Sequence, residues 1–408
     1  MWGLVERHMR GDRVIWGLMM TLSVFSLLAV YSSTGTLAYK YYGGNTTHYM
    51  LKHLVFLILG ITVAIFLHKL HYKVFARFAK GILWVSIILL MMTLAMGISL
   101  NQAARWLTVP GIGISFQPSE LAKFALIIYV SRILSQHQEE GVPAKNAFMP
   151  SMVYIGIVCG LIFTENLSTA SMIGFVSMVL MFVGRVPFKY LAGTAAVALA
   201  GITLIIILSS YVPFLHRAET WKARIERYIS KDSSQEKEDA GDFQSNQAKI
   251  AVATGGLFGK GPGNSYQRNF LPHPYSDFIY AIVVEEFGFV GGFFILLIYL
   301  TLLYRAALIV RQSTKTFPAF LALGLSLILV MQAMINMGVA VGLFPVTGQP
   351  LPLVSMGGTS ILFAFAAFGI ILSVSRCNIE DVDGDKAPKE TANAGTSAKA
   401  PQYSEAEA

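Results

Sequence analysis

Residues 271–292 read LPHPYSDFIYAIVVEEFGFVGG and place three acids in or beside a long apolar run. Asp277 stands at the start of the run, and Glu285 and Glu286 follow about two turns further along if the run is a helix. An ionisable residue at membrane depth is costly, which makes it a candidate for function. The stretch therefore predicts a functional acid, Asp277, at one end of a membrane-spanning helix.

The composition agrees with a membrane protein. The chain has 408 residues, of which 54% are hydrophobic and only 13% charged, whereas soluble domains carry about 25% charged residues. The formal charge of +8 is explained by Lys and Arg residues that flank the apolar runs, as the positive-inside rule requires. We therefore exclude nucleic acid as a partner. The two cysteines, Cys159 and Cys377, show no spacing typical of a metal site or a disulfide.

The apolar runs predict an all-α polytopic membrane protein with about ten transmembrane helices and both termini in the cytoplasm, since basic residues gather in alternate loops. A cleaved signal peptide is rejected for the first run, because YSSTGT follows it instead of a small-residue cleavage site. The predicted spans are 15–30, 54–67, 81–99, 121–134, 148–163, 169–183, 191–211, 278–304, 319–341 and 360–374.

Three parts follow from these spans. Residues 1–14 form a cytoplasmic N-terminus, and residues 15–376 form the transmembrane domain. This domain includes a large loop outside the membrane, 214–276, between the seventh and eighth helices. The charged tail, 377–408, is nearly devoid of apolar residues and is predicted to be disordered in the cytoplasm.

The large loop contains two distinct stretches. In WKARIERYI (221–229), apolar and basic residues alternate at helical spacing, which predicts an amphipathic helix on the outer leaflet. A solvated basic stretch is the alternative. The following SKDSSQEKEDAGD (230–242) is polar and predicted to be mobile.

Residues 255–263, GGLFGKGPG, hold five glycines in nine positions. Glycine permits close backbone approach, and free amides in such a turn can cradle phosphate oxygens, with Lys260 adding a cation. The segment is not a Walker A loop, because no Gly-Lys-Ser/Thr closes it. A plain turn between helices is the alternative.

Two further stretches combine polar and irregular sequence. In QPSELAK (117–123), Glu120 and Lys123 are three residues apart and share a helix face; a structural ion pair and a substrate contact both remain open. Residues 342–360, GLFPVTGQPLPLVSMGGTS, are uncharged and irregular, which indicates backbone that enters the membrane inside protein or beside water. Gln332 and Asn336 on the preceding helix can satisfy that backbone.

Five motifs in order resemble the SEDS family of bacterial envelope proteins, typified by FtsW, RodA and SpoVE, over residues 12–376. They are AARW (103–106), QPSELAK (117–123), GLFGKGPGNS (256–265), LPHPYSDFIYAIVVEEFGFVG (271–291) and FPVTGQPLPLVSMGGTS (344–360). The resemblance implies a peptidoglycan glycosyltransferase that polymerises lipid II at the outer face of the bacterial cytoplasmic membrane. It also implies a class B penicillin-binding transpeptidase (FtsI-like) and other divisome proteins as partners.

The start GDRVIWG (11–17), YSST (31–34) and the charged tail look more like the FtsW branch than the RodA branch. This implies septal wall synthesis in cell division, with RodA-like elongation as the alternative. A lipid II flippase and a non-catalytic division scaffold are two further alternatives. The crowding of polar features on the outer side favours an outer-leaflet enzyme over a transporter.

The resemblance also implies roles for individual residues. Asp277 matches the essential acid of the family. Departures occur at Asn166, where many members have an aspartate, and at Met356, where an aromatic residue is common. The expected substrate-binding residues are Arg105, Glu120, Lys123, Lys260, Arg268, Ser355, Gly357 and Gly358.

The expected reaction is attack of the lipid II C4 hydroxyl on the lipid-linked strand, with pyrophosphate leaving. General-base help is worth about 10²–10⁴-fold, and Asp277 can supply it; helix capping is the alternative for this residue. The leaving group requires positive charge from Arg105, Lys260, Arg268 or a divalent cation (Mg²⁺ or Mn²⁺). No organic cofactor is expected, and the metal ligands are not identified.

Overall fold

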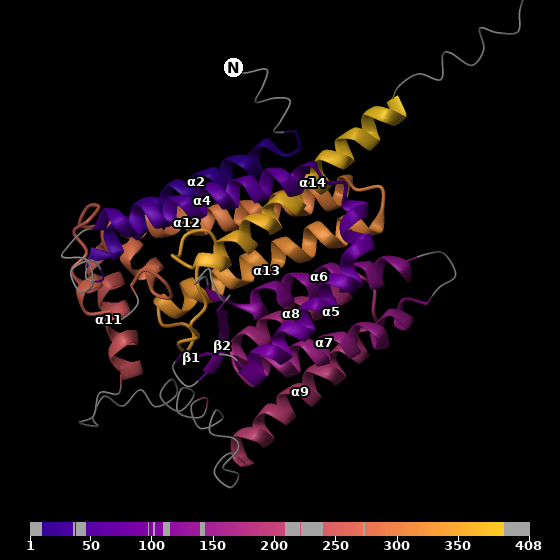
Figure 1. The fold of residues 1–408 in the computed structure, drawn as a ribbon, viewed down its shortest axis with the longest axis horizontal. Coiled ribbons are helices and arrows are strands. Elements are labelled where there is room, and N and C mark those ends of the chain that lie inside the picture. Colours follow the sequence, from indigo (N-terminus) through magenta and orange to yellow (C-terminus); the bar gives the residue numbers. More distant parts are fainter. Residues whose placement is uncertain are drawn as a thin grey trace, which may run out of the picture.

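A computed structural model describes residues 10–35, 37, 46–96, 98–100, 103–108, 115–138, 143–208, 221, 240–271 and 274–386. Within them, a helix coincides with each of the ten predicted spans (Figure 1). These helices are α2 (Arg13–Ser33), α4 (Thr46–Lys69), α5 (Tyr72–Met96), α6 (Pro118–Gln136), α7 (Phe148–Phe163), α8 (Leu167–Val183), α9 (Phe188–Leu208), α12 (Ile279–Gln312), α13 (Thr316–Ala340) and α14 (Gly358–Lys386).

Eight helices of the described chain are long and apolar enough to cross a membrane, with α7 counted together with the preceding turn as Ala144–Phe163. The two others have simple reasons for failing that test. Helix α8 is 17 residues long, and α6 carries Glu120, Lys123 and Arg132 in its apolar sequence. The prediction of an all-α polytopic membrane protein is confirmed.

The bundle is centred on α13 and α14. In these helices 67% and 72% of an 18-residue apolar stretch is buried, respectively. Helix α9 lies at the edge, with 6% of the corresponding stretch buried (Figure 1). Glycines allow α14 to pack closely against α4: a Cβ on Gly60 would come within 2.1 Å of the Phe365 ring, and one on Gly369 within 2.6 Å of the Ala64 carbonyl. Such small residues let membrane helices approach closely.

The three strands and α11 lie toward one end of the bundle, and the C-terminal turns of α14 project at the other (Figure 1). Three short strands, β1 (Ile98–Leu100), β2 (Ala103–Thr108) and β3 (Ser115–Phe116), form an antiparallel sheet in that order. Helix α11 (Ala240–Gly255) packs on α12, and the 3₁₀ turns are η1 (Ala144–Ala147) and η3 (Gln267–Asn269).

Two predictions about irregular segments are wrong in part. Helix α11 begins at Ala240, inside the stretch 230–242 that was predicted to be mobile. Helix α14 continues to Lys386, so the start of the predicted disordered tail is helical. At the start of this continuation, the side-chain amide of Asn378 donates to the Ile309 carbonyl of α12 at 3.2 Å. The predicted amphipathic helix 221–229 lies outside the described residues except for Trp221.

Candidate functional site

Asp277 lies in the turn that precedes α12 and is half-buried. The N-cap of α12 is Phe278, so the alternative that Asp277 caps this helix is wrong. The Oδ1 atom of Asp277 accepts a hydrogen bond of 2.9 Å from the Ser276 hydroxyl. A Cβ on Gly348 would lie 3.6 Å from its Oδ2 atom, so the carboxylate lies beside the irregular segment between α13 and α14.

The backbone around Asp277 is held at three consecutive carbonyls. The Tyr275 carbonyl accepts from the Met356 amide at 2.9 Å, and the Ser276 carbonyl accepts from the Ser355 hydroxyl at 2.6 Å. The Asp277 carbonyl accepts from the Asn336 side-chain amide at 2.8 Å. The main chain that carries the acid is therefore fixed, and Ser355, expected to bind substrate, is part of this support.

The irregular segment 344–357 is buried at residues 349 and 351–355, and side chains satisfy part of its backbone. Gln332 Nε2 donates to the Pro350 carbonyl at 2.8 Å, and Asn336 Nδ2 donates to the Gln349 carbonyl at 2.7 Å. Both contacts confirm the prediction that these two α13 side chains serve this backbone. Irregular backbone at membrane depth requires such internal partners.

The predicted pair of Glu120 and Lys123 is confirmed. Lys123 Nζ lies 2.7 Å from Glu120 Oε2, and the side chains are 1% and 5% exposed, respectively. Lys123 also donates to Gln332 Oε1 at 2.6 Å. Because Gln332 in turn holds the Pro350 carbonyl, the ion pair is linked to the irregular segment beside Asp277.

The glycine-rich segment 255–263 packs against a kink in α12, at which Gly288 has a φ of 71°. The amides of Lys260 and Gly261 donate to the carbonyls of Glu285 and Glu286 at 3.0 and 2.9 Å. These amides are therefore not free to cradle a phosphate, and that interpretation is wrong. The segment instead provides hydrogen bonds to α12 where the helix is interrupted.

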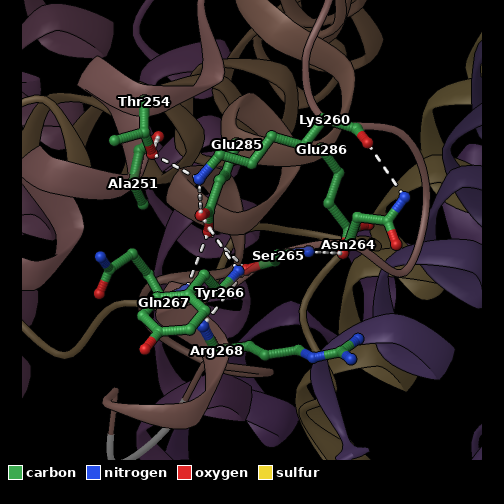
Figure 2. A network of polar contacts seen from close by, with 10 residues as sticks. All are labelled: Ala251, Thr254, Lys260, Asn264, Ser265, Tyr266, Gln267, Arg268, Glu285 and Glu286. Carbon is green, nitrogen blue, oxygen red and sulfur yellow. Dashed lines mark hydrogen bonds and ion pairs between the residues drawn. The ribbon is translucent and has the colours of Figure 1, made fainter.

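Glu285 is fully buried and joins this segment to the one that follows (Figure 2). Lys260 Nζ lies 2.6 Å from its Oε1 atom. The same carboxylate accepts from Ser265 Oγ at 2.5 Å and from the amides of Tyr266 and Gln267 at 3.1 and 3.2 Å. Lys260, expected to face a pyrophosphate, therefore has its charge balanced inside the protein.

Arg268 is directed toward α2. Its Nη1 atom donates to the Ser32 carbonyl at 3.0 Å, and the Ser32 hydroxyl donates to Glu286. The buried Glu286 also accepts from the Ser265 amide at 3.3 Å. Arg268 thus serves a network distinct from the support of Asp277.

For the other predicted site residues, the structure gives the position of the backbone but few side-chain contacts. Arg105 lies on β2, and its side chain is outside the description. Gly357 and Gly358 lie at the start of α14, where Gly358 has a φ of 40°. Sequence reasoning did not single out Ser276 or the direct support of Asp277 by Asn336; the polar spacing of Gln332 and Asn336 was the only signal for the latter.

No group of three His, Cys, Asp or Glu residues that could hold a metal occurs in the part of the chain that the structure describes. Asp277 can offer one carboxylate to a cation. Mg²⁺ often uses one or two carboxylates together with substrate phosphates, so a metal site here would depend largely on substrate oxygens.

Comparison with known proteins identifies relatives over most of the chain. The family model of cell cycle proteins of the FtsW, RodA and SpoVE type matches residues 12–380. A protein of Trichlorobacter lovleyi named "Probable peptidoglycan glycosyltransferase FtsW" is 31% identical over 89% of this chain and 93% of its own. Stage V sporulation protein E of Bacillus subtilis is also 31% identical, over 87% and 94%.

Two solved structures have a similar fold. A chain described under "Structural coordination of polymerization and crosslinking by a peptidoglycan synthase complex" has a TM-score of 0.68 and 26% identity, covering 91% of this chain and 99% of that one. The rod shape determining protein RodA of Thermus thermophilus has a TM-score of 0.63 and 24% identity, covering 90% and 97%. The second likeness concerns the fold alone.

Proposed function

The chain belongs to the FtsW, RodA and SpoVE family of cell cycle proteins, and we propose that it polymerises lipid II into glycan strands for the division septum. It is a peptidoglycan glycosyltransferase and a multi-pass membrane protein, as its relatives and its apolar helices support. The main support for the site is the placement of Asp277. Its carboxylate is half-buried, and its main chain is held at three consecutive carbonyls.

Asp277 is the general base in this proposal. Its carboxylate takes the proton of the lipid II C4 hydroxyl as that oxygen bonds to the anomeric carbon of the lipid-linked strand. The bond from that carbon to the lipid pyrophosphate breaks, and the pyrophosphate leaves with the electron pair. A base held in place is worth about 10²–10⁴-fold in rate. The Ser276 hydroxyl, 2.9 Å away, orients the carboxylate.

The pyrophosphate needs positive charge that Lys260 and Arg268 are poorly placed to give. Lys260 is paired with Glu285, and Arg268 donates to Ser32. We therefore assign this role to a divalent cation, Mg²⁺ or Mn²⁺, together with Arg105. The cation would neutralise charge on the substrate phosphates, whose oxygens would be its main ligands.

The proposed setting is the bacterial cytoplasmic membrane at the septum, with both termini in the cytoplasm. The proposed partners are a class B penicillin-binding transpeptidase and other divisome proteins. Similarity to a chain from a peptidoglycan synthase complex supports the choice of partner. Similarity to relatives named FtsW supports septal synthesis over elongation. Depletion in cells should give filaments, whereas a loss of rod shape would indicate elongation instead.

The test is gel-resolved glycan synthesis from purified lipid II, with the transpeptidase present and with Mg²⁺, Mn²⁺ or EDTA. We expect polymer from the wild type with a divalent cation and none from Asp277→Asn, although both proteins remain folded. Polymer formation by the variant at the wild-type rate would refute the role of Asp277. If neither protein made polymer, lipid II translocation in liposomes would test the flippase alternative.

A further inference from the structure

We propose that Asn336 is a positioning residue that sets the place of Asp277, a proposal that rests on the function proposed above. Asn336 lies on α13 and is 1% exposed. Its single Nδ2 atom donates to the carbonyl of Asp277 at 2.8 Å and to the carbonyl of Gln349 at 2.7 Å. One amide thus joins three segments: α13, the irregular segment 344–357 and the turn before α12.

The orientation of the Asn336 amide is fixed by its neighbours. Both contacts are carbonyl oxygens, which only accept hydrogen bonds, so the –NH₂ group must face them. The Oδ1 atom is then buried with no hydrogen-bond partner in the described part of the chain. A buried acceptor without a partner costs free energy. At Asn336 both amide hydrogens are directed to the two carbonyls although Oδ1 remains without a partner among the described residues.

The contact acts on the carboxylate through one short path. The held carbonyl carbon of Asp277 is bonded to the Cα atom from which the side chain extends. The preceding carbonyls, of Tyr275 and Ser276, are held by the Met356 amide and the Ser355 hydroxyl. With all three fixed, the direction of the Asp277 Cα–Cβ bond is set, and the Ser276 hydroxyl orients the carboxylate, as proton transfer in a bound complex requires.

The same support distinguishes Asn336 from a residue that binds substrate. Asn336 is buried and contacts the carbonyls of Asp277 and Gln349, and Gln349 is not among the residues expected to bind substrate. Removal of Asn336 should therefore displace the base and leave the substrate-binding residues in place. We therefore expect a fall in kcat with little change in KM. A residue that only stabilises the bundle would lower the amount of folded protein and leave kcat per folded molecule unchanged.

The first experiment compares Asn336→Leu with Asn378→Leu in the full chain with its transpeptidase. Asn378 is a matched control, since it is also buried and donates from Nδ2 to the Ile309 carbonyl and Ser313 Oγ, on the far side of the bundle. We expect Asn336→Leu to lower kcat about 10–100-fold, as for a misplaced catalytic group, and the control to keep the wild-type kcat. Equal kcat values for the two variants, or a loss carried by KM alone, would overturn the proposal.

The second experiment does not depend on activity. Hydrogen–deuterium exchange of peptides covering 274–282 should become faster in Asn336→Leu and stay unchanged in Asn378→Leu. Unchanged exchange in both variants would overturn the positioning role even if the protein were inactive. Absence of polymer from the wild type would instead count against the proposed function alone. If Asn336→Leu does not fold, Asn336→Ser, which keeps one donor, replaces it with the same expected direction.

Discussion

Replacing Glu285 by Gln tests the buried carboxylate that joins the glycine-rich segment to α12. The carboxylate accepts from Lys260 Nζ, Ser265 Oγ and the amides of Tyr266 and Gln267. Its Oε1 atom serves Lys260 and Tyr266, and its Oε2 atom serves Ser265 and Gln267. Glutamine has one oxygen, so its –NH₂ group must face one of the two main-chain amides in either orientation.

The expected loss follows from these contacts. A buried amide left without an acceptor costs about 1–3 kcal/mol. Lys260 is one-third exposed and can turn to water, so the lost ion pair adds no more than about 1 kcal/mol. Glu285→Gln should therefore reduce the free energy of unfolding by about 1–4 kcal/mol. Lys260→Met should also destabilise, because it leaves a fully buried carboxylate with neutral donors only.

The chain has a built-in probe of unfolding, because Cys377 is fully buried and Cys159 partly buried, and both are free thiols. A thiol-reactive dye added during heating reports when they become exposed. We expect a lower midpoint for Glu285→Gln and for Lys260→Met, and a double variant less destabilised than the sum of the two. Strict additivity, or a wild-type midpoint for Glu285→Gln, would refute the reasoning.

Three further substitutions test local contacts. Gly259→Ala should prevent correct folding, since its Cβ would come within 2.2 Å of the Glu286 carbonyl at a φ of 79°. Gly263→Ala has open space at a φ of 80° and should reduce the free energy of unfolding by only about 1–2 kcal/mol. Folded yields of the two variants, compared by size-exclusion chromatography, check both expectations. Asp12→Asn should keep its bonds to the α2 amides but lose the 2.6 Å pair with the partly exposed Arg305, so we expect a loss of up to about 1 kcal/mol and a small fall in the thiol-labelling midpoint.

The sequence was sufficient for the helices and for local polar pairs. Uninterrupted apolar runs predict spans, and Glu120 and Lys123 pair because three residues bring them to one face. Gln332 and Asn336 were predicted to serve the irregular backbone, because that backbone needs donors and these two residues are side-chain amides on the adjacent helix. Each of these inferences uses neighbours in sequence or a general requirement of buried backbone.

The contacts that were missed join distant parts of the chain. Lys260 was predicted to bind phosphate because nothing local indicates that Glu285, 25 residues later, returns to meet it. The kink at Gly288 makes this meeting possible, and glycine in a sequence only permits such a conformation. Arg268 and Ser32 are separated by 236 residues. Pairings of this kind depend on helix packing, which periodicity does not specify.

The two networks together explain how a loop can hold the proposed catalytic base precisely. The Glu285 carboxylate fixes residues 265–267. Asn336 and Ser355 fix residues 276–277, which lie further along the same loop. Catalytic groups on loops require such a rigid support. Because Asn336 contacts Asp277 itself and Glu285 acts ten residues away, loss of Asn336 should reduce kcat more than loss of Glu285. Loss of Glu285 should in turn reduce stability more than kcat, so the two variants separate placement of the base from stability of the loop.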